Sequence, residues 1–219
     1  MSIPRQLNLE SIAATALAIA DTDGFAAVSM RRVAHELGVG TMSLYYYVKT
    51  KAELIAAMDD ALMAGVVAPT LPDDWRKALT TIAHHTRDVF IRHPWALCSM
   101  QSAPPGVNAM RHMEQCLKAL AETGMTTEQK LTLLALVDDF VFGYTLRETA
   151  GDPVVDIDSA KDLLRTGAFP ELKKAFGKEQ KLCIPNRFAL GLEAILGVAG
   201  ERILVGSHRR QNRRHNSGK

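Results

Sequence analysis

The sequence predicts an all-α protein built from two helical domains. Apolar residues recur three or four positions apart along most of the 219 residues, which is the spacing of amphipathic helices. We find no stretch in which apolar and polar residues alternate as in a strand, and no internal repeat. Hydrophobic residues make up 47% of the chain and charged residues 23%, as in a globular protein with a substantial core.

The first helix is expected from Leu9 to near Gly24. Asn8 can cap its first turn, because an asparagine oxygen can accept an otherwise unpaired backbone N–H. Its inward positions are Leu9, Ile12, Ala13, Ala16 and Ala20. The residues expected to complete a three-helix core with it are Phe25, Val28, Val33, Leu37, Leu44 and Val48.

Residues 29–51 predict two short helices around a tight turn. Ser29 can cap the first helix, and Gly38 stands where the chain must turn, a position that favours a residue tolerant of positive φ. The second helix, Thr41–Tyr47, points Leu44 inward. Two helices joined by a short glycine-containing turn, the second short and amphipathic, form the helix-turn-helix pattern that enters the major groove of DNA.

Three adjacent tyrosines, Tyr45, Tyr46 and Tyr47, support a DNA-facing role for the second helix. Successive residues of a helix are about 100° apart, so the three rings cannot all share one inward face. At least one hydroxyl must therefore face outward, where it can donate to a phosphate oxygen. The alternative is an aromatic surface that packs against a neighbouring helix.

The net charge of +2 says little about nucleic acid, because residues 207–219 contain five basic residues and no acidic one. Without them, 21 basic residues face 24 acidic ones. We expect this tail to be disordered rather than DNA-binding. Position is more informative, because the Lys and Arg residues within 1–65 all lie at or beside the expected DNA surface: Arg5, Arg31, Arg32, Lys49 and Lys51.

Residues 9–60 resemble the DNA-binding domain of the TetR family of bacterial transcriptional regulators. The matching segments are Asp21–Phe25, Ser29–Ala34, Leu37–Val39, Ser43–Tyr45 and Lys51–Leu54. The resemblance implies a homodimeric repressor that binds a palindromic double-stranded operator and releases it when a small-molecule effector binds. We expect base-edge contacts from Thr41, Met42 and Tyr46. The full expected DNA-binding set is Ser29, Met30, Arg31, Thr41, Met42, Ser43, Tyr45, Tyr46, Tyr47, Lys49 and Lys51.

A fourth helix is expected from Lys51 to about Val67, because Thr50 and Glu53 have the spacing of a capping box. It would link the DNA-binding domain to the effector domain. Pro69 and Pro72 mark the boundary between the two. The chain is therefore expected to contain a DNA-binding domain with its linking helix, a ligand-binding and dimerisation domain, and a basic tail, at residues 1–67, 68–206 and 207–219.

Helical spacing predicts several helices in the second domain. The longest, Leu131–Glu148, is opened by the capping pair Thr126 and Gln129 and is apolar almost all the way round, so we expect it to be buried on most sides. In residues 107–123, the inward positions are Met110, Met113, Leu117 and Leu120. The remaining helices are expected after Asp74 up to His93, across 158–165, and from Phe188 to Leu204.

The second domain resembles the tetracycline-repressor-like branch of the family. The residues that carry this are Asp74–Arg76, Arg92–Pro94, Gly143, Phe188 with Gly191–Glu193, and Ile195–Gly197. The resemblance implies that two of its helices pair with their copies in a second subunit. A monomeric core helix is the alternative for Leu131–Glu148. The expected interface residues are Val137, Val141, Phe188, Leu192, Ile195, Leu196 and Ala199.

A ligand pocket is expected among the helices of this domain. Asp138 and Asp139 are informative, because two carboxylates in an apolar helix are costly to bury unpaired. At least one should face a cavity, an arginine such as Arg147, or the subunit interface, and both a ligand anchor and an interface ion pair remain open. Methionine and aromatic residues here also fit a plain core. The further pocket candidates are His85, Met100, His112, Met113, Cys116 and Phe142.

The three cysteines, Cys98, Cys116 and Cys183, are odd in number and widely spaced, so they predict neither a disulfide framework nor a metal site, and a reducing cytoplasm fits. No apolar run suggests a membrane span. We expect no cofactor, no metal and no enzymatic activity, because adjacent His84 and His85 point about 100° apart and no catalytic motif appears. The alternative function is a helical small-molecule binder or enzyme with a vestigial DNA-binding domain.

Overall fold

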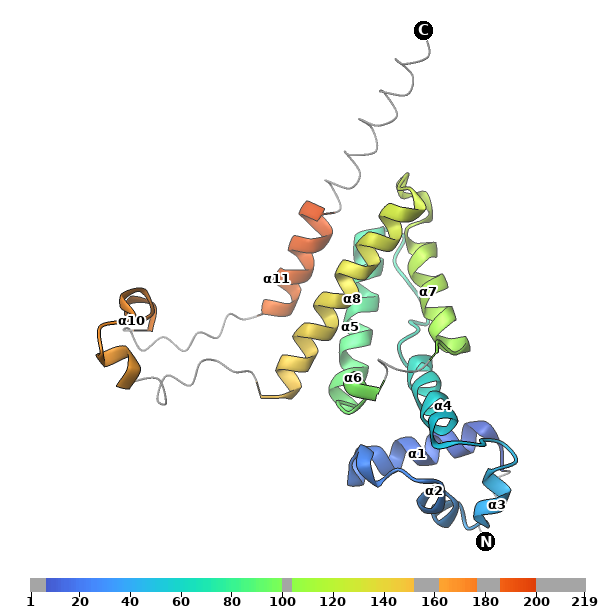
Figure 1. Ribbon diagram of the computed structural model, residues 1–219. Helices are drawn as coiled ribbons and strands as arrows, with labels where there is room; N and C mark the ends of the chain where they lie inside the picture. Colours follow the sequence, from blue (N-terminus) through green and yellow to red (C-terminus); the bar gives the residue numbers. More distant parts are fainter. Residues whose placement is uncertain (1–6, 100–103, 152–161, 177–185, 200–219) are drawn as a thin grey trace.

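The computed structural model describes residues 7–99, 104–151, 162–176 and 186–199. These residues form helices and no strand, so the predicted all-α class is confirmed. In Figure 1, α1 to α3 lie together at one end and α4 leads from them to the larger helical body. The α-helices are α1 (Leu9–Asp23), α2 (Met30–Leu37), α3 (Thr41–Leu44), α4 (Lys51–Ala64), α5 (Trp75–Arg92), α6 (Ala96–Ser99), α7 (Val107–Ala119), α8 (Thr127–Thr149), α10 (Pro170–Phe176) and α11 (Arg187–Ala194).

The first two helices, α1 and α2, begin and end where the sequence predicts. The Asn8 side chain accepts the Ser11 N–H at 2.7 Å, and the Ser29 hydroxyl accepts the Arg32 N–H at 3.2 Å. Gly38 ends α2 in the left-handed region, with φ of 67°. The predicted three-helix core is present except for Leu9, which was expected to point inward but is 48% exposed. The most deeply buried of its predicted members are Ile12, Ala16, Val28, Val33 and Leu44, and Leu54 of α4 packs with them.

Two details of the predicted N-terminal elements are wrong. Helix α3 ends at Leu44, and Tyr45–Tyr47 continue as turns rather than as helix. At the start of α4, the Thr50 hydroxyl accepts the Glu53 N–H as predicted, but the Glu53 carboxylate accepts the N–H of Lys49 at 2.7 Å rather than that of Thr50. Both differences tighten the connection between α3 and α4.

The C-terminal domain packs around the neighbouring helices α5, α7 and α8, with α11 against α8 (Figure 1). Thr126 and Gln129 form the predicted capping box at the start of α8. The expectation that α8 is buried on most sides is wrong for the single chain, because Leu136 and Leu146 are 42% and 49% exposed. Met110 was expected to point inward but is 58% exposed on α7.

The end of the chain is described only in part. Helix α11 continues as π-helix from Ile195 to Ala199, which agrees with the predicted Phe188–Leu204 helix as far as it is described. Residues 200–206, the basic tail at 207–219, and most of the helix expected across 158–165 lie outside the described residues. Within the described helices, none is both long and apolar enough to span a membrane.

Candidate functional site

The first candidate site is the surface formed by α3 and the turn after it. Leu44 and Val48 are buried in the N-terminal core, and this orientation turns the three tyrosines outward. Tyr46 is 88% exposed, and Tyr45 and Tyr47 are each 42% exposed. Met42 is 81% exposed and Ser43 is exposed, while Thr41 is half-buried. This surface is therefore rich in hydroxyl groups and open to a large partner.

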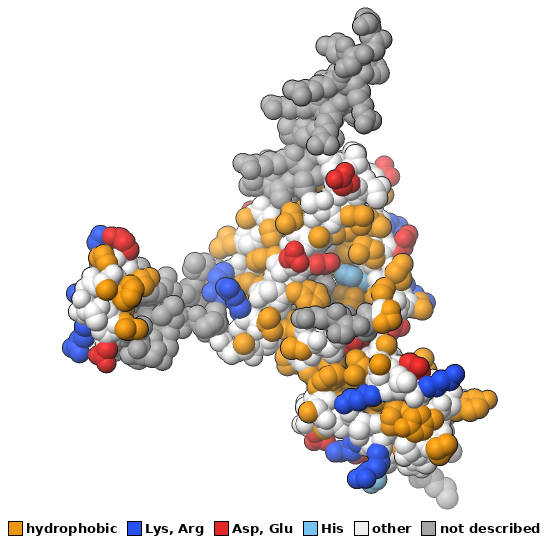
Figure 2. All heavy atoms as spheres, viewed as in Figure 1, with side chains coloured by type: hydrophobic (Ala, Val, Ile, Leu, Met, Phe, Trp, Pro, Cys, Tyr) orange, Lys and Arg blue, Asp and Glu red, His pale blue; other side chains and the backbone are white. Residues whose placement is uncertain are grey.

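Exposed cations surround these tyrosines. Among the described residues, no hydrogen-bonding or ion-pair partner contacts the side chains of Arg31, Lys49 or Lys51. Arg32 differs, because it pairs with Asp23 at 2.7 Å and with Glu36 at 2.9 Å. Figure 2 shows Lys and Arg side chains interspersed with side chains of the hydrophobic class on the N-terminal domain. The unpaired cations are the ones available to a polyanion.

One expected DNA-binding residue is placed elsewhere. The Met30 side chain is 8% exposed and packs in the N-terminal core, so the prediction that it lies on the DNA-facing surface is wrong. Its side chain therefore points into this core and not toward solvent. Ser29 beside it is exposed, although its hydroxyl already accepts a backbone N–H of α2.

The N-terminal domain is joined to the body at two places. At α4, the Asp60 carboxylate accepts the Asn108 N–H at 2.7 Å, and the buried Asp59 accepts the Ser99 hydroxyl at 2.8 Å. Burial raises the pKa of Asp59, while the hydrogen bond from Ser99 opposes that rise. Gly106 approaches Asp60 so closely that a Cβ on Gly106 would overlap its carboxylate. These contacts join helix α4 to the start of α7.

The second joint lies at the end of α1. Asp21 accepts hydrogen bonds from the ring nitrogens of His93 at 2.7 Å and Trp95 at 2.8 Å, when the histidine carries its proton on Nδ1. The Trp95 ring stacks on Phe25 with centroids 5.4 Å apart. This contact holds the N-terminal domain against the loop between α5 and α6.

The second candidate site lies between α7 and α8. His112 and Cys116 are buried one turn apart on α7, with the Cys116 sulfur 3.8 Å from His112 Nε2. Nδ1 of His112 is buried without a hydrogen-bond partner. Burial lowers the pKa of His112, so its ring is neutral at pH 7. Asp138 on α8 is half-buried, one helical turn from Leu134 and Val141, which pack in the same apolar cluster as Cys116. Burial, and then the charge of Asp138, raise the pKa of Cys116 to about 12.

Not every expected pocket residue joins this group. Asp139 and Arg147 are exposed on α8, so Asp139 is corrected from a pocket residue to a surface residue. Asp138 is the more buried carboxylate, and burial, with the nearby charge of Asp139, raises its pKa to about 6. Phe142 instead packs on Phe90, with ring centroids 4.8 Å apart.

The remaining residues predicted to line the pocket are half-buried or lie outside the described residues. Met113 is half-buried and packs on the main C-terminal core, and His85 is half-buried on α5. Met100 lies outside the described residues. No group of three potential metal ligands occurs in the part of the chain that the structure describes.

The expected dimer-interface residues also need correction. Val137, Val141, Phe188, Leu192 and Leu196 are each at most 5% exposed and form the core of a single subunit. Ile195 is half-buried against the same core, and the side chain of Ala199 lies outside the described part. Val137 and Val141 on α8 therefore point into their own subunit. The large apolar residues exposed on α8 and α11 are Leu131, Leu136, Leu146 and Leu190.

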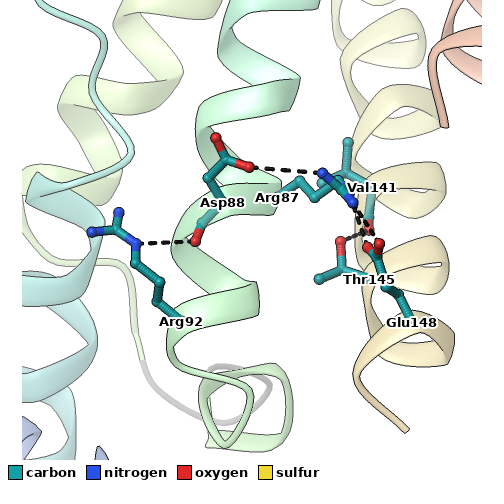
Figure 3. A network of polar contacts seen from close by, with 6 residues as sticks. All are labelled: Arg87, Asp88, Arg92, Val141, Thr145 and Glu148. Carbon is teal, nitrogen blue, oxygen red and sulfur yellow. Dashed lines mark hydrogen bonds and ion pairs between the residues drawn. The ribbon is translucent and has the colours of Figure 1, made fainter. Parts of the chain in front are cut away.

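An ion pair joins α5 to the last turn of α8. Arg87 Nε donates to Glu148 at 2.9 Å, and a second guanidinium nitrogen donates to the other carboxylate oxygen (Figure 3). The Arg87 guanidinium also lies 5.1 Å from the centroid of the Phe188 ring. The ion pair with Glu148 raises the pKa of Arg87. This arginine is thus held in a structural contact between three helices.

Comparison with known proteins agrees with this architecture. A family model described as "Bacterial regulatory proteins, tetR family" matches residues 12–58, and one described as "Tetracyclin repressor-like, C-terminal domain" matches residues 68–200. The chain belongs to the TetR family. The second match covers the helices that contain the His112 and Asp138 region.

Two of the TetR-family proteins that this chain resembles come from streptomycetes. The transcriptional repressor DrrR1 of Streptomyces coeruleorubidus is 40% identical over 140 residues, which are 63% of this chain and 52% of DrrR1. The alignment thus spans about half the length of that relative. Apo ActR of Streptomyces coelicolor has a TM-score of 0.77 and 30% identity, covering 96% of this chain and all of ActR. ActR in complex with actinorhodin has a TM-score of 0.73 and 28% identity, covering 91% of this chain and 98% of ActR.

Proposed function

We propose that this protein is a homodimeric transcriptional repressor that binds operator DNA through α2, α3 and the Tyr45–Tyr47 turn, and releases it when a small molecule binds the C-terminal domain. The observation that carries DNA binding is the group of exposed tyrosines surrounded by unpaired Arg31, Lys49 and Lys51. Tyrosine and serine hydroxyls and these cations suit phosphate oxygens, and the start of α3 suits base edges. We take residues 1–67 and 68–206 as the two functional domains.

Effector response is supported by the relatives and by the two joints. ActR forms a complex with actinorhodin, which makes a small-molecule effector the natural proposal for this chain as well. The effector must bind the DNA-releasing state more tightly than the DNA-binding state, because equal affinity would shift nothing. The contacts of Asp60 with Asn108 and of Asp21 with Trp95 give a route by which movement of α7 or α6 reaches the N-terminal domain.

The experiment is a salt-titrated binding assay with DNA fragments that flank the protein's own gene. We expect one fragment to be retained at physiological salt, with an affinity that falls steeply as salt rises. Tyr45→Phe combined with Lys51→Ala should weaken that affinity and reduce the salt slope by about 1, because one cationic phosphate contact is lost. The dimer should stay intact in gel filtration.

Lys77→Ala is the matched control, because Lys77 is exposed on α5, outside the proposed DNA surface. It should leave both affinity and slope unchanged. Unaltered operator binding by the double variant would contradict the assignment of the DNA-binding surface. If no DNA fragment is bound specifically, the proposed repressor function is contradicted.

A further inference from the structure

The interior between α7 and α8 contains polar groups that the fold itself does not use. His112 is 9% exposed, and its Nδ1 has no hydrogen-bond partner. A buried polar atom without a partner costs free energy, so a native structure usually supplies a partner from protein, water or ligand. Cys116 engages only the other ring nitrogen, at 3.8 Å. One ring nitrogen of His112 is thus left for a further group.

The half-buried Asp138 is the second polar group of this region. It lies on the α8 face that also carries the buried Leu134 and Val141, one turn away in each direction. Within the described residues, no hydrogen bond or ion pair reaches its carboxylate. An unpaired carboxylate in such surroundings is costly, and a cationic partner would relieve that cost.

The protein's own cations do not supply that partner. Arg87 is committed to Glu148, as Figure 3 shows. Arg147 is exposed on α8. The region therefore contains one carboxylate and one neutral imidazole, and an anion would meet repulsion from Asp138 without a compensating charge. A metal ion is not favoured either, because the described residues offer no cluster of three ligands.

We propose that the effector is a small organic cation, whose protonated amine pairs with Asp138 while a polar group beside it hydrogen-bonds to Nδ1 of His112. This inference rests on the proposed effector response of the C-terminal domain and names the chemical class of the effector. An ammonium group gives charge-assisted hydrogen bonds to a carboxylate in a region where water competes weakly. The apolar surroundings, such as Leu134 and Met113, would accept the hydrocarbon part of the molecule.

The test uses the full-length protein and three probes of the same shape: 1-naphthylmethylamine, 1-naphthylmethanol and 1-naphthoic acid. Binding is measured by isothermal titration calorimetry. We expect the amine to bind about tenfold more tightly than the alcohol, because a charge-assisted hydrogen bond replaces a neutral one, and the acid to bind most weakly. This comparison needs no variant. The proposal is overturned if the amine does not bind, or if the alcohol or the acid binds as tightly.

Asp138→Asn and Asp139→Asn form a matched pair of neighbouring carboxylates. Asp138→Asn should abolish the preference for the amine and leave alcohol binding unchanged, whereas Asp139→Asn should keep the wild-type preference, because Asp139 is exposed. Persistence of the amine preference in Asp138→Asn would overturn the assignment.

Operator binding by the same proteins separates this inference from the proposed function. Wild type that binds operator but shows no amine preference would overturn only the effector class. Wild type that prefers the amine but binds no operator would overturn the repressor function and leave the ligand site standing.

Discussion

Two adjacent carboxylates on α8 have opposite surroundings. One helical step turns Asp139 about 100° away from Asp138, which leaves Asp139 exposed and Asp138 half-buried. The sequence predicts that one of the pair faces the interior but does not say which, because both have apolar residues three and four positions away. The choice depends on where α7 packs, and that is a property of the tertiary fold.

The Asp138→Asn variant should therefore change stability in a pH-dependent way. The folded protein holds the pKa of Asp138 at about 6, against an ordinary value of 3.8, so it binds this proton more tightly than the unfolded chain does. Stability from this proton is fully present below about pH 4 and is lost as pH rises through 6. At pH 8 the asparagine variant should be more stable by up to about 3 kcal/mol, and this gain should vanish near pH 4.

Urea unfolding followed by circular dichroism at pH 4, 6 and 8 measures this difference. Asp139→Asn is the control and should show a much smaller dependence on pH, because its carboxylate is exposed. Equal stability of wild type and Asp138→Asn at pH 8 would contradict burial of an unpaired carboxylate.

At the scale of elements, local signals predicted the helix starts well. Asn8, Ser29 and Thr126 cap the helices that they were expected to cap, because a cap involves residues only three positions apart. Helical geometry predicted that at least one of the three tyrosines faces outward. All three are exposed, although their backbone forms turns rather than a helix. What the sequence did not reveal is where distant segments meet. Asp21 and His93 are 72 residues apart, and no periodic pattern marks their hydrogen bond.

The same reason explains the wrong interface residues. Apolar residues almost all the way round α8 predicted that it is buried on most sides, but α11 covers one of those sides from within the subunit. Phe140 and Phe188 stack with ring centroids 5.4 Å apart, and Gly191 lets α11 approach that stack. A Cβ on Gly191 would lie 2.5 Å from the Phe140 ring, which Phe188 and Tyr144 hold in place.

Gly191→Ala should consequently loosen the contact between α11 and α8. Overpacking of this kind costs about 1–3 kcal/mol, which exceeds the gain of up to about 1 kcal/mol from replacing a helical glycine with alanine. Gly197→Ala is the matched control in the same helical segment, because no atom lies within 4 Å of a Cβ there. Thermal unfolding should show a lower Tm for Gly191→Ala only. A Tm unchanged in both variants would mean that the Phe140 ring can move aside.

At the scale of the whole molecule, α8 keeps an apolar face that its own subunit does not cover. Leu136 and Leu146 are exposed on this face together with Gly143, and Leu190 is 52% exposed on the adjacent α11. A Cβ on Gly143 would meet nothing in its own chain, so the subunit fold does not require glycine there. Close approach of a second backbone would require it. Leucines exposed beside such a position indicate an interface with a second copy.

Dimerisation through this face can be tested with Leu136→Asp. A charge placed in an apolar interface is costly to bury, so the variant should run in gel filtration with light scattering at the mass of one chain, while wild type runs at the mass of two. Met110→Asp is the control, because Met110 is 58% exposed on α7, away from this face, and should remain dimeric.

The monomeric variant should keep its helical content and lose most of its operator affinity. A palindromic operator is bound by two recognition helices about 34–36 Å apart, and one subunit supplies only one of them. A dimeric Leu136→Asp protein would place the interface elsewhere. A monomeric variant with full operator affinity would contradict the requirement for two N-terminal domains, and with it the link between the α8 face and DNA binding.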